Sequence, residues 1–302
     1  MKYKKILNEI EILKKDRKAL ILAHNYQRPE VQEIADITGD SLELAQAASE
    51  TDSEIIVFCG VRFMAETASI LNPGKKVYLP ENSAGCPMAD MIGADALRNI
   101  KKNHPGVPVV TYVNSPAEVK AESDICCTSS NAVEVVKSVS SGKVIFVPDR
   151  NLGSFVASRV DKELILWDGY CYVHDRLTRE EVLRIKDAHP GAEIIAHPEC
   201  RAEVLEIADA VLSTAGMLDY AGKTPAKTII VATEIGMLWP LKKAAPRKEF
   251  IPASFNMVCR EMKSITLDSV LSSLKDERFE VKVPESTGKK ALSAIQKMLS
   301  VK

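Results

Sequence analysis

An excess of positive charge is missing from the 302-residue sequence, in which 40 Lys and Arg side chains are balanced by 41 Asp and Glu side chains, giving a net charge of −1. Proteins that neutralise many nucleic-acid phosphates carry clustered positive charge, so we expect no nucleic-acid partner. Long hydrophobic runs are missing as well. A run such as Ile55–Cys59 falls far short of the roughly 18 apolar residues that span a bilayer. We therefore expect no membrane association.

The first ten residues lack the apolar core of a secretion signal and are typical of a charged amphipathic helix. The cysteines number 7, an odd count, and the Cys-x-x-Cys pairs of zinc ribbons are not among them. We therefore expect a cytoplasmic location, where thiols stay reduced and serve as metal ligands or core residues rather than as disulfide partners.

Hydrophobic residues make up 46% of the chain and charged residues 27%, which is ordinary for a folded globular protein. This composition excludes a disordered chain, a fibrous repeat and a small disulfide scaffold. Length alone would suggest about two domains.

An internal repeat changes that expectation. His104-Pro105-Gly106 and His189-Pro190-Gly191 stand 85 residues apart, and each precedes a short apolar run. Three residues at or near the ends of apolar runs keep a matching register: His24, Tyr112 and His197 are separated by 88 and then 85 residues. The same two offsets separate three aspartates that precede short apolar stretches, namely Asp36, Asp124 and Asp209. A fixed period of this kind indicates three structural units of about 85 residues.

Each unit contains four short apolar segments separated by helical stretches. The predicted strands lie near 19–24, 35–38, 54–59 and 75–80, then 108–113, 124–127, 143–147 and 163–167, then 192–197, 209–213, 227–231 and 249–252. Val- and Ile-rich runs without polar alternation are typical of sheets covered on both faces, and the intervening helices favour parallel pairing. The predicted fold class is α/β, with three pseudo-threefold-related α/β/α units that each hold a four-stranded parallel sheet.

We place the unit boundaries at residues 1–88, 89–173 and 174–302. The third range includes a C-terminal extension, in which the sequence predicts a helix over 266–274, a strand over 279–283 and a last helix to about residue 299. We expect this extension to pack on the first unit.

Ligands of parallel α/β sheets bind beyond the carboxyl ends of the strands, and the repeat places polar residues there in register. They are His24, Tyr112 and His197 at the strand ends, Tyr26, Asn114 and Glu199 two residues later, and Ser41, Ser129 and Thr214 at helix starts. A hydroxyl at a helix start can cap the helix, and the free N–H groups beside it attract anions. We therefore expect a site for carboxylates or phosphate.

Three cysteines share the register. Cys86, Cys171 and Cys259 each follow the fourth strand of a unit, separated by 85 and then 88 residues. Packed about a pseudo-threefold axis, their thiolates would form an incomplete ligand set for an iron–sulfur cluster, which usually has four cysteines. The open iron could then act as a Lewis acid. Zinc held by the three cysteines and a water is the alternative. The other cysteines lack the register and are expected to be structural: Cys59, Cys126, Cys127 and Cys200.

Longer motifs surround these positions and extend over nearly the whole chain. They include Leu22-Ala23-His24-Asn25-Tyr26-Gln27, Gly39-Asp40-Ser41-Leu42, Gly85-Cys86-Pro87-Met88, Tyr112-Val113-Asn114-Ser115, Thr128-Ser129-Ser130-Asn131, Gly169-Tyr170-Cys171-Tyr172-Val173-His174, His197-Pro198-Glu199-Cys200 and Thr233-Glu234-Ile235-Gly236-Met237. Together they resemble the quinolinate synthase family of de novo NAD biosynthesis. Arg62 and the pair Arg260-Glu261 depart from the usual family pattern, at positions that we expect to lie away from the ligands.

The resemblance implies an enzyme that condenses iminoaspartate with dihydroxyacetone phosphate to quinolinate, phosphate and water. It also implies a [4Fe–4S] cluster with three cysteine ligands and one open iron, held by Cys86, Cys171 and Cys259. The predicted catalytic residues are Glu199, Tyr26, His24 and His197. The predicted substrate-binding residues are His24, Ser41, Tyr112, Val113, Asn114, Ser129, His174, His197, Pro198, Glu199 and Thr214.

Glu199 is the expected proton-transferring base, because a carboxylate near a cluster and an imidazole can be tuned toward neutral pH. Iminoaspartate is short-lived, so transient contact with an iminoaspartate-producing enzyme is expected as well. Two other functions remain open from the residues alone. One is a zinc-dependent lyase or hydrolase that uses the same thiolates, and the other is a non-catalytic iron–sulfur sensor.

Overall fold

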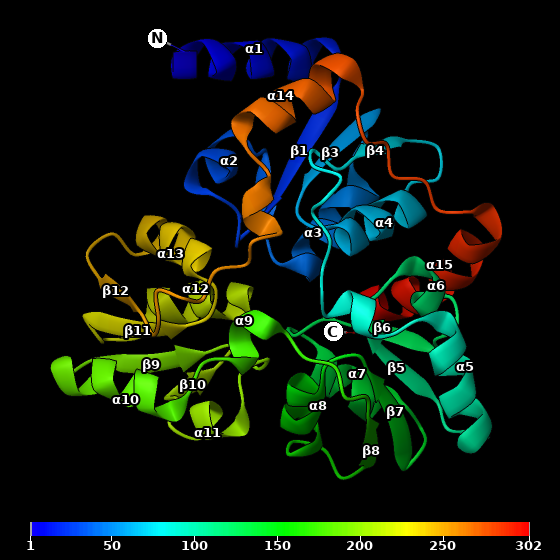
Figure 1. The fold of residues 1–302 in the computed structure, drawn as a ribbon, viewed down its shortest axis with the longest axis vertical. Helices are drawn as coiled ribbons and strands as arrows, with labels where there is room; N and C mark the ends of the chain where they lie inside the picture. Colours follow the sequence, from blue (N-terminus) through cyan, green and yellow to red (C-terminus); the bar gives the residue numbers. More distant parts are fainter. Residues whose placement is uncertain (1, 302) are drawn as a thin grey trace.

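Three parallel sheets form three lobes around a shared centre (Figure 1). The computed structural model describes residues 2–301. Each sheet has four strands, and the strands of each unit lie in the same spatial order: second, first, third and fourth. All the pairings are parallel, as the predicted fold class requires. The prediction of three α/β units with four-stranded parallel sheets is therefore confirmed.

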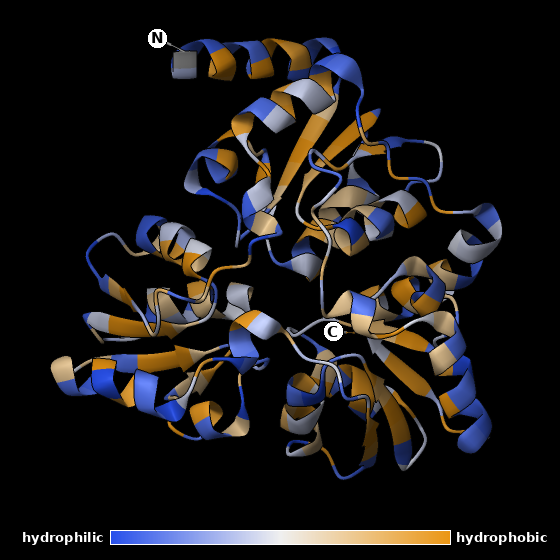
Figure 2. Ribbon diagram, viewed as in Figure 1, coloured by the Kyte–Doolittle hydropathy of each residue, from blue (hydrophilic) through white to orange (hydrophobic). Residues whose placement is uncertain are grey.

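The strands are short and close to the predicted positions. The first sheet contains β1 (Ala19–His24), β2 (Ile37–Gly39), β3 (Ile55–Cys59) and β4 (Lys76–Tyr78). The second contains β5 (Val109–Tyr112), β6 (Ile125–Cys127), β7 (Lys143–Val147) and β8 (Glu163–Leu166), and the third contains β9 (Glu193–Ala196), β10 (Ala210–Val211), β11 (Thr228–Ala232) and β12 (Glu249–Pro252). The strands are hydrophobic along most of their length (Figure 2), because helices cover both faces of each sheet.

The helices follow the strands in each unit. In the first unit they are α1 (Lys2–Asp16), α2 (Pro29–Ile34), α3 (Ser41–Glu50) and α4 (Arg62–Leu71). In the second they are η1 (Ala89–Met91), α5 (Ala94–Asn103), α6 (Ala117–Lys120), α7 (Ala132–Ser138), α8 (Arg150–Ala157) and α9 (Tyr172–Asp175). The third has α10 (Arg179–Ala188), α11 (Ala202–Leu205), α12 (Thr214–Lys223), η2 (Ile235–Met237) and α13 (Leu238–Ala244), followed by η3 (Met262–Ser264), α14 (Leu267–Asp276) and α15 (Glu285–Ser300).

The repeated aspartates have one structural role in all three sheets. Asp36 accepts a hydrogen bond from the backbone N–H of Ile21 at 2.8 Å. The equivalent bonds run from Val109 to Asp124 and from Ile194 to Asp209, each at 2.7 Å. Each aspartate directly precedes an edge strand, and its carboxylate binds the backbone of the neighbouring central strand. This shared contact explains why the repeat preserves an aspartate at these positions.

The C-terminal extension differs from the prediction in one segment. Residues 279–283 do not form a strand and pair with the first sheet only through an isolated antiparallel bridge between Tyr78 and Glu280. Glu277 and Phe279 have positive φ angles of 51° and 62°, which turn the chain away from an extended path. The predicted strand is therefore wrong.

The two helices of the extension pack on different parts of the molecule (Figure 1). Helix α14 lies against α1 and β3 of the first sheet. Helix α15 lies against α6 and β6, and it also reaches α4. The C-terminal extension contacts elements of the first and of the second unit, so its packing does not define where one unit ends and the next begins. The boundaries near residues 88 and 173 therefore stay a prediction. None of the helices within residues 2–301 combines the length and apolar character that crossing a bilayer requires.

Candidate active site

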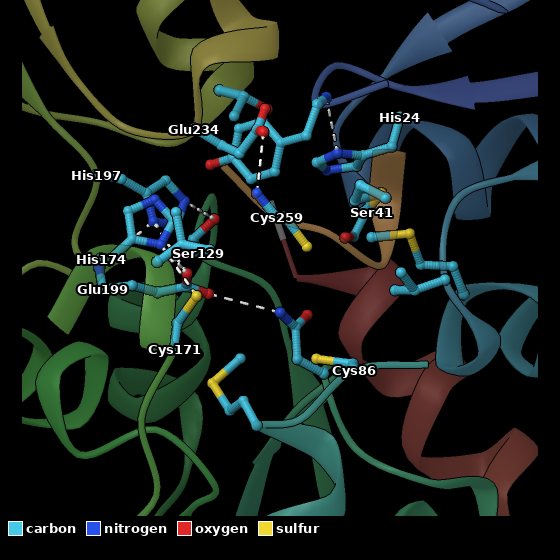
Figure 3. A pocket seen from close by; sticks show the side chains of 18 of the residues that line it. His24, Ser41, Cys86, Ser129, Cys171, His174, His197, Glu199, Glu234 and Cys259 are labelled. Atoms are coloured by element: carbon cyan, nitrogen blue, oxygen red, sulfur yellow. Dashed lines mark hydrogen bonds and ion pairs between the residues drawn. The ribbon is translucent and has the colours of Figure 1, made fainter. Parts of the chain in front are cut away.

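The carboxyl ends of the strands face a central cavity that residues from all three units line. The predicted site residues that line it are His24, Tyr26, Ser41, Cys86, Tyr112, Asn114, Ser129, Cys171, His174, His197, Glu199, Thr214 and Cys259. Val113 and Pro198 are not part of this lining, and Val113 borders a smaller cavity beside it. Figure 3 shows side chains of the three units pointing toward one another across the cavity.

The three hydroxyl residues at the helix starts do not cap their helices. Asp40 is the N-cap of α3 and Ser213 is the N-cap of α12, so Ser41 and Thr214 occupy the first helical position. Ser129 lies three residues before Ala132, where α7 begins without a side-chain cap. The alternative interpretation of these hydroxyls as plain helix caps is not borne out, because the preceding residue takes this role in α3 and α12. All three residues still line the cavity.

Glu199 is the most densely contacted polar group of the cavity. Tyr112 donates a 2.7 Å hydrogen bond from its hydroxyl to Glu199 Oε1, and Asn114 Nδ2 lies 3.5 Å from the same oxygen. On the other side, His174 Nδ1 lies 2.8 Å from Glu199 Oε2. The backbone carbonyl of Glu199 accepts a 3.1 Å bond from Asn151. Residues of two units therefore fix this carboxylate in place.

A chain of hydrogen bonds connects Glu199 to Tyr26 of the first unit. His174 Nε2 lies 2.8 Å from Thr233 Oγ1, which in turn lies 2.6 Å from the Tyr26 hydroxyl. Thr233 is buried between them and was not among the predicted site residues. Its position one residue after β11 was a usable indication, because polar residues at that edge face the ligand side of a parallel sheet.

The predicted histidines are buried and close together. His24 and Tyr26 make an edge-on ring contact at 4.7 Å, and the rings of His174 and His197 lie 4.8 Å apart. Tyr26 N–H donates to His24 Nδ1 at 3.1 Å, and Glu199 N–H donates to His197 Nδ1 at 3.4 Å. The same local turn thus recurs in the first and third units. His197 Nε2 lies 3.2 Å from the hydroxyl of Ser129.

Burial and hydrogen bonding set the protonation of these groups. Burial lowers the pKa of His24 and of His197 to about 3, so both imidazoles are neutral near pH 7. Burial by itself would raise the pKa of Glu199, but His197, His174 and the Tyr112 hydroxyl lower it to about 2. These groups hold Glu199 as a carboxylate near pH 7, and its tuning by a bound cluster stays a prediction.

The three cysteines in register line the same cavity. Burial, the Glu199 carboxylate and the neighbouring Cys259 and Cys86 sulfurs raise the pKa of Cys171, in that order. The Cys171 Sγ lies 3.2 Å from His174 Nδ1. Among residues 2–301, ligand atoms of Cys171, His174 and Glu199 lie within 4.8 Å of one another, a group that could hold a metal ion. The four cysteines outside the register are fully buried, as predicted for structural thiols: Cys59, Cys126, Cys127 and Cys200.

One departure from the family pattern lies beside a proposed ligand. Glu261 Oε2 lies 3.5 Å from Cys259 Sγ and accepts a 2.7 Å hydrogen bond from the Tyr172 hydroxyl. The expectation that the Arg260-Glu261 pair lies away from the ligands is therefore wrong. The 3₁₀ turn η3 follows directly and brings the Glu261 side chain back toward Cys259.

A triplicated parallel fold with a central cavity and a group of cysteine, histidine and glutamate side chains defines an α/β protein with a candidate catalytic metal site. Residues 8–300 match the family described as quinolinate synthetase A protein.

Relatives named quinolinate synthase support the same assignment. One from Dehalococcoides mccartyi (strain ATCC BAA-2266 / KCTC 15142 / 195) is 55% identical over 98% of this chain and 98% of its own length. Another from Geobacter sp. (strain M21) is 55% identical over 97% of each chain. A quinolinate synthase 1 from Methanosarcina acetivorans is 52% identical over 98% of each chain. The chain belongs to this enzyme family, as its motifs predicted.

Proposed function

We propose that the chain is a quinolinate synthase that condenses iminoaspartate with dihydroxyacetone phosphate to give quinolinate, phosphate and water. One observation carries the proposal beyond the family match: the three register cysteines and the Glu199–His174 pair line one cavity, although they come from separate parts of the chain. Family membership favours this enzyme over a zinc-dependent lyase or an iron–sulfur sensor.

The cysteine environment fits a [4Fe–4S] cluster with three protein ligands. The sulfur of Cys86 accepts backbone N–H groups of Met88 and Ala89, that of Cys171 accepts the N–H of His174, and that of Cys259 accepts the N–H of Met262. Such donors stabilise thiolate ligands and tune the reduction potential of iron–sulfur clusters. When bound, the cluster would supply a Lewis-acidic iron without a fourth cysteine.

The thiols also need a cation to become ligands. Burial raises the pKa of Cys86 to about 12 and raises the pKa of Cys259 as well. Without metal, such thiols stay protonated at neutral pH, and metal binding releases their protons.

The cavity binds anions without basic side chains. Among the described residues that line it there is no lysine or arginine, and the polar groups are hydroxyls, imidazoles, amides and carboxyls. Ser41 and Thr214 begin two ten-residue helices, where their hydroxyls can bind the phosphate and carboxylates of the substrates. Asn114 Oδ1 is buried without a hydrogen-bond partner in the structure, so it can accept a bond from a substrate N–H or O–H.

Proton transfer is assigned to Glu199 and its neighbours. The ionised carboxylate can take a proton from a substrate carbon or nitrogen, and His174 supports the charge. Because Nδ1 of each ring accepts a backbone N–H, neutral His24 and His197 carry their proton on Nε2, from which each can donate a hydrogen bond that orients the substrates. The Tyr26 hydroxyl reaches His174 through Thr233 and can return a proton during loss of water.

Two further parts of the proposal concern the surroundings of the enzyme. Free thiols that ligate iron require a reducing compartment, which supports a cytoplasmic location. Iminoaspartate hydrolyses in water, so brief contact with the enzyme that makes it would limit the loss. Titration of such an enzyme into the assay should raise the quinolinate yield above that obtained with free iminoaspartate.

An anaerobic assay tests the function directly. Protein purified without oxygen is expected to be brown, to contain iron and sulfide, and to form quinolinate from both substrates, detected by mass spectrometry. Zinc without sulfide would support the lyase alternative. Iron and sulfide without any quinolinate would support the sensor alternative.

A further inference from the structure

We infer that Glu234 and Lys263 are positioning residues that join Tyr26 to the loop carrying Cys259. The inference rests on the proposed function, since it assigns a positioning role to two residues beside the same cavity. Neither residue was among the predicted site residues. Their contacts connect an element of the first unit with two elements of the third.

Glu234 is the centre of the connection. Its side chain has no exposed surface, and it borders the cavity just after β11. Oε1 accepts the backbone N–H of Cys259 at 3.1 Å (Figure 3), and Oε2 accepts the N–H of Gly236 at 2.6 Å. A carboxylate that binds the peptide of Cys259 fixes the direction from which this sulfur enters the cavity.

Lys263 links this carboxylate to the first unit. Its ammonium group lies 2.9 Å from Glu234 Oε2 and also donates to the backbone carbonyl of Tyr26. The backbone of Lys263 is held in turn, because its carbonyl accepts a 2.8 Å bond from Arg28 Nε and its N–H donates to the Cys259 carbonyl at 3.1 Å. The ammonium therefore contacts both the tyrosine segment and the carboxylate that holds the cysteine loop.

The backbone of Gly236 packs closely against the pair. A Cβ atom on Gly236 would lie 2.6 Å from Lys263 Nζ, 2.6 Å from the Tyr26 carbonyl oxygen and 2.7 Å from Glu234 Oε2. Gln32 Nε2 donates to the carbonyls of Asn25 and Gln27 on either side of Tyr26. Close backbone approach at Gly236 thus lets the ion pair form.

The ion pair also forms part of the wall between the cavity and the surface. Glu234 faces the cavity, whereas Lys263, 16% exposed, lines an outer groove together with Arg28, Trp239 and Lys242. Burying two charges is costly unless they are paired and hydrogen-bonded, and here both conditions are met. A pair in this place is better explained by orientation of its neighbours than by stability alone.

The test of the Tyr26 connection uses Lys263→Met in the wild-type chain and in Tyr26→Phe. In the wild-type chain we expect about a tenfold fall in kcat, the loss typical of one charge-assisted hydrogen bond, with KM little changed. In the Tyr26→Phe background we expect no further fall, because the hydroxyl that Lys263 positions is gone. Lys263→Arg should restore part of kcat.

Lys242→Met is the matched control, because Lys242 lines the same outer groove and its ammonium donates to a backbone carbonyl on the surface, that of Lys248, at 2.9 Å. We expect wild-type kcat and KM for this variant. An equal fall of kcat for Lys263→Met in both backgrounds would overturn the positioning of Tyr26, and so would wild-type kcat in Lys263→Met.

The test of the Cys259 connection does not depend on activity. The double variant Glu234→Met/Lys263→Met removes both charges. It therefore leaves no unpaired buried charge, which is the feature that could prevent a single variant from folding. Loss of iron to a chelator, followed by absorbance, is expected to be about fivefold faster in this double variant than in Lys263→Met, because the Cys259 N–H has lost its acceptor. Equal rates in the two variants would overturn this connection.

The two tests separate this inference from the proposed function. If the wild-type chain binds iron and sulfide but forms no quinolinate, the proposed function fails while the iron-release comparison still reports on Glu234. If the wild-type chain forms quinolinate and both comparisons show no difference, only the positioning role fails.

Discussion

Tyr112 of the second unit donates a 2.7 Å hydrogen bond to Glu199 of the third, and both side chains are almost fully buried. The bond places an ionised carboxylate at the meeting point of two sheets. Because His174 supplies a second contact at 2.8 Å, the carboxylate is oriented from two sides before any substrate enters. Such preorganised groups need little reorganisation during the reaction.

The first prediction concerns this carboxylate. Glu199→Gln keeps the size of the side chain but removes its charge and its ability to take a proton. We expect normal iron and sulfide content and quinolinate formation at least about 100-fold slower, the usual contribution of a general base. Glu203→Gln on the surface of α11 is the matched control and should be fully active. Full activity of Glu199→Gln would remove Glu199 from the role.

The second prediction concerns acid stability. His24 and His197 have pKa values lowered from 6.5 to about 3, so between these pH values the unfolded chain binds protons that the folded chain does not. The free energy of unfolding therefore rises with pH in this window and falls on acidification, by about 1.4 kcal/mol per pH unit for each imidazole. Below pH 4.5 Glu199 acts in the same direction, because its pKa is lowered to about 2.

Urea unfolding between pH 7 and pH 4.5 measures this effect. We expect the midpoint to move steadily to lower urea as the pH falls below 6.5. A midpoint that stays constant from pH 7 to pH 5 would show that the two imidazoles are not buried in the neutral form.

The third prediction concerns the metal ligands. Cys86→Ala, Cys171→Ala and Cys259→Ala should each give colourless, inactive protein, because each removes one of the sulfurs that face the cavity. Cys59→Ala is the control, since Cys59 is buried in β3 and should not affect iron content. Iron analysis and visible absorbance under anaerobic conditions provide the measurement. Retention of a full cluster in any of the three variants would contradict the assignment of that cysteine.

The fourth prediction concerns a contact among all three units. Ser130 Oγ lies 2.9 Å from Ser213 Oγ and also donates to Asp40. Ser130→Ala removes both contacts, and we expect the free energy of unfolding to fall by about 1 kcal/mol with iron content unchanged. Ser138→Ala is the control, because that hydroxyl bonds only within its own helix, to the carbonyl of Val135. Equal stability of the two variants would contradict a role for Ser130 in joining the units.

The fold could be predicted because the repeat supplied information that single segments lack. Asp36, Asp124 and Asp209 recur because each binds the same strand N–H, so the register in the sequence is a register of hydrogen bonds. The same register identified the three cysteines that line the cavity. Segments outside the repeat were harder, as residues 279–283 show. Their path depends on two residues with positive φ that nothing in the local hydrophobic pattern indicates.

The sequence predicted most of the residues that line the site, but not the contacts that they make with one another. The sequence showed that Ser41 and Thr214 stand at helix starts, yet whether they or their neighbours cap the helix depends on one residue of offset. Thr233 was missed, and Glu261 was wrongly placed away from the ligands, because their contacts, to Tyr26 and Cys259, are between segments distant in the chain or across a tight turn. The lowered pKa of Glu199 likewise follows from His197 and His174 of its own unit and from the Tyr112 hydroxyl of the second unit. Such contacts become visible only when the three sheets are placed together.

Because the three lobes belong to one chain, residues at corresponding positions of the lobes can differ in type. His24, Tyr112 and His197 occupy corresponding positions, as do Tyr26, Asn114 and Glu199, yet among these corresponding residues of the cavity lining the cysteines alone are the same in all three lobes. An assembly of three identical chains would have to repeat every side chain around its axis. A single fused polypeptide can keep a symmetric set of sulfurs and surround it with an asymmetric set of acids, bases and amides, which is what two dissimilar reactants demand.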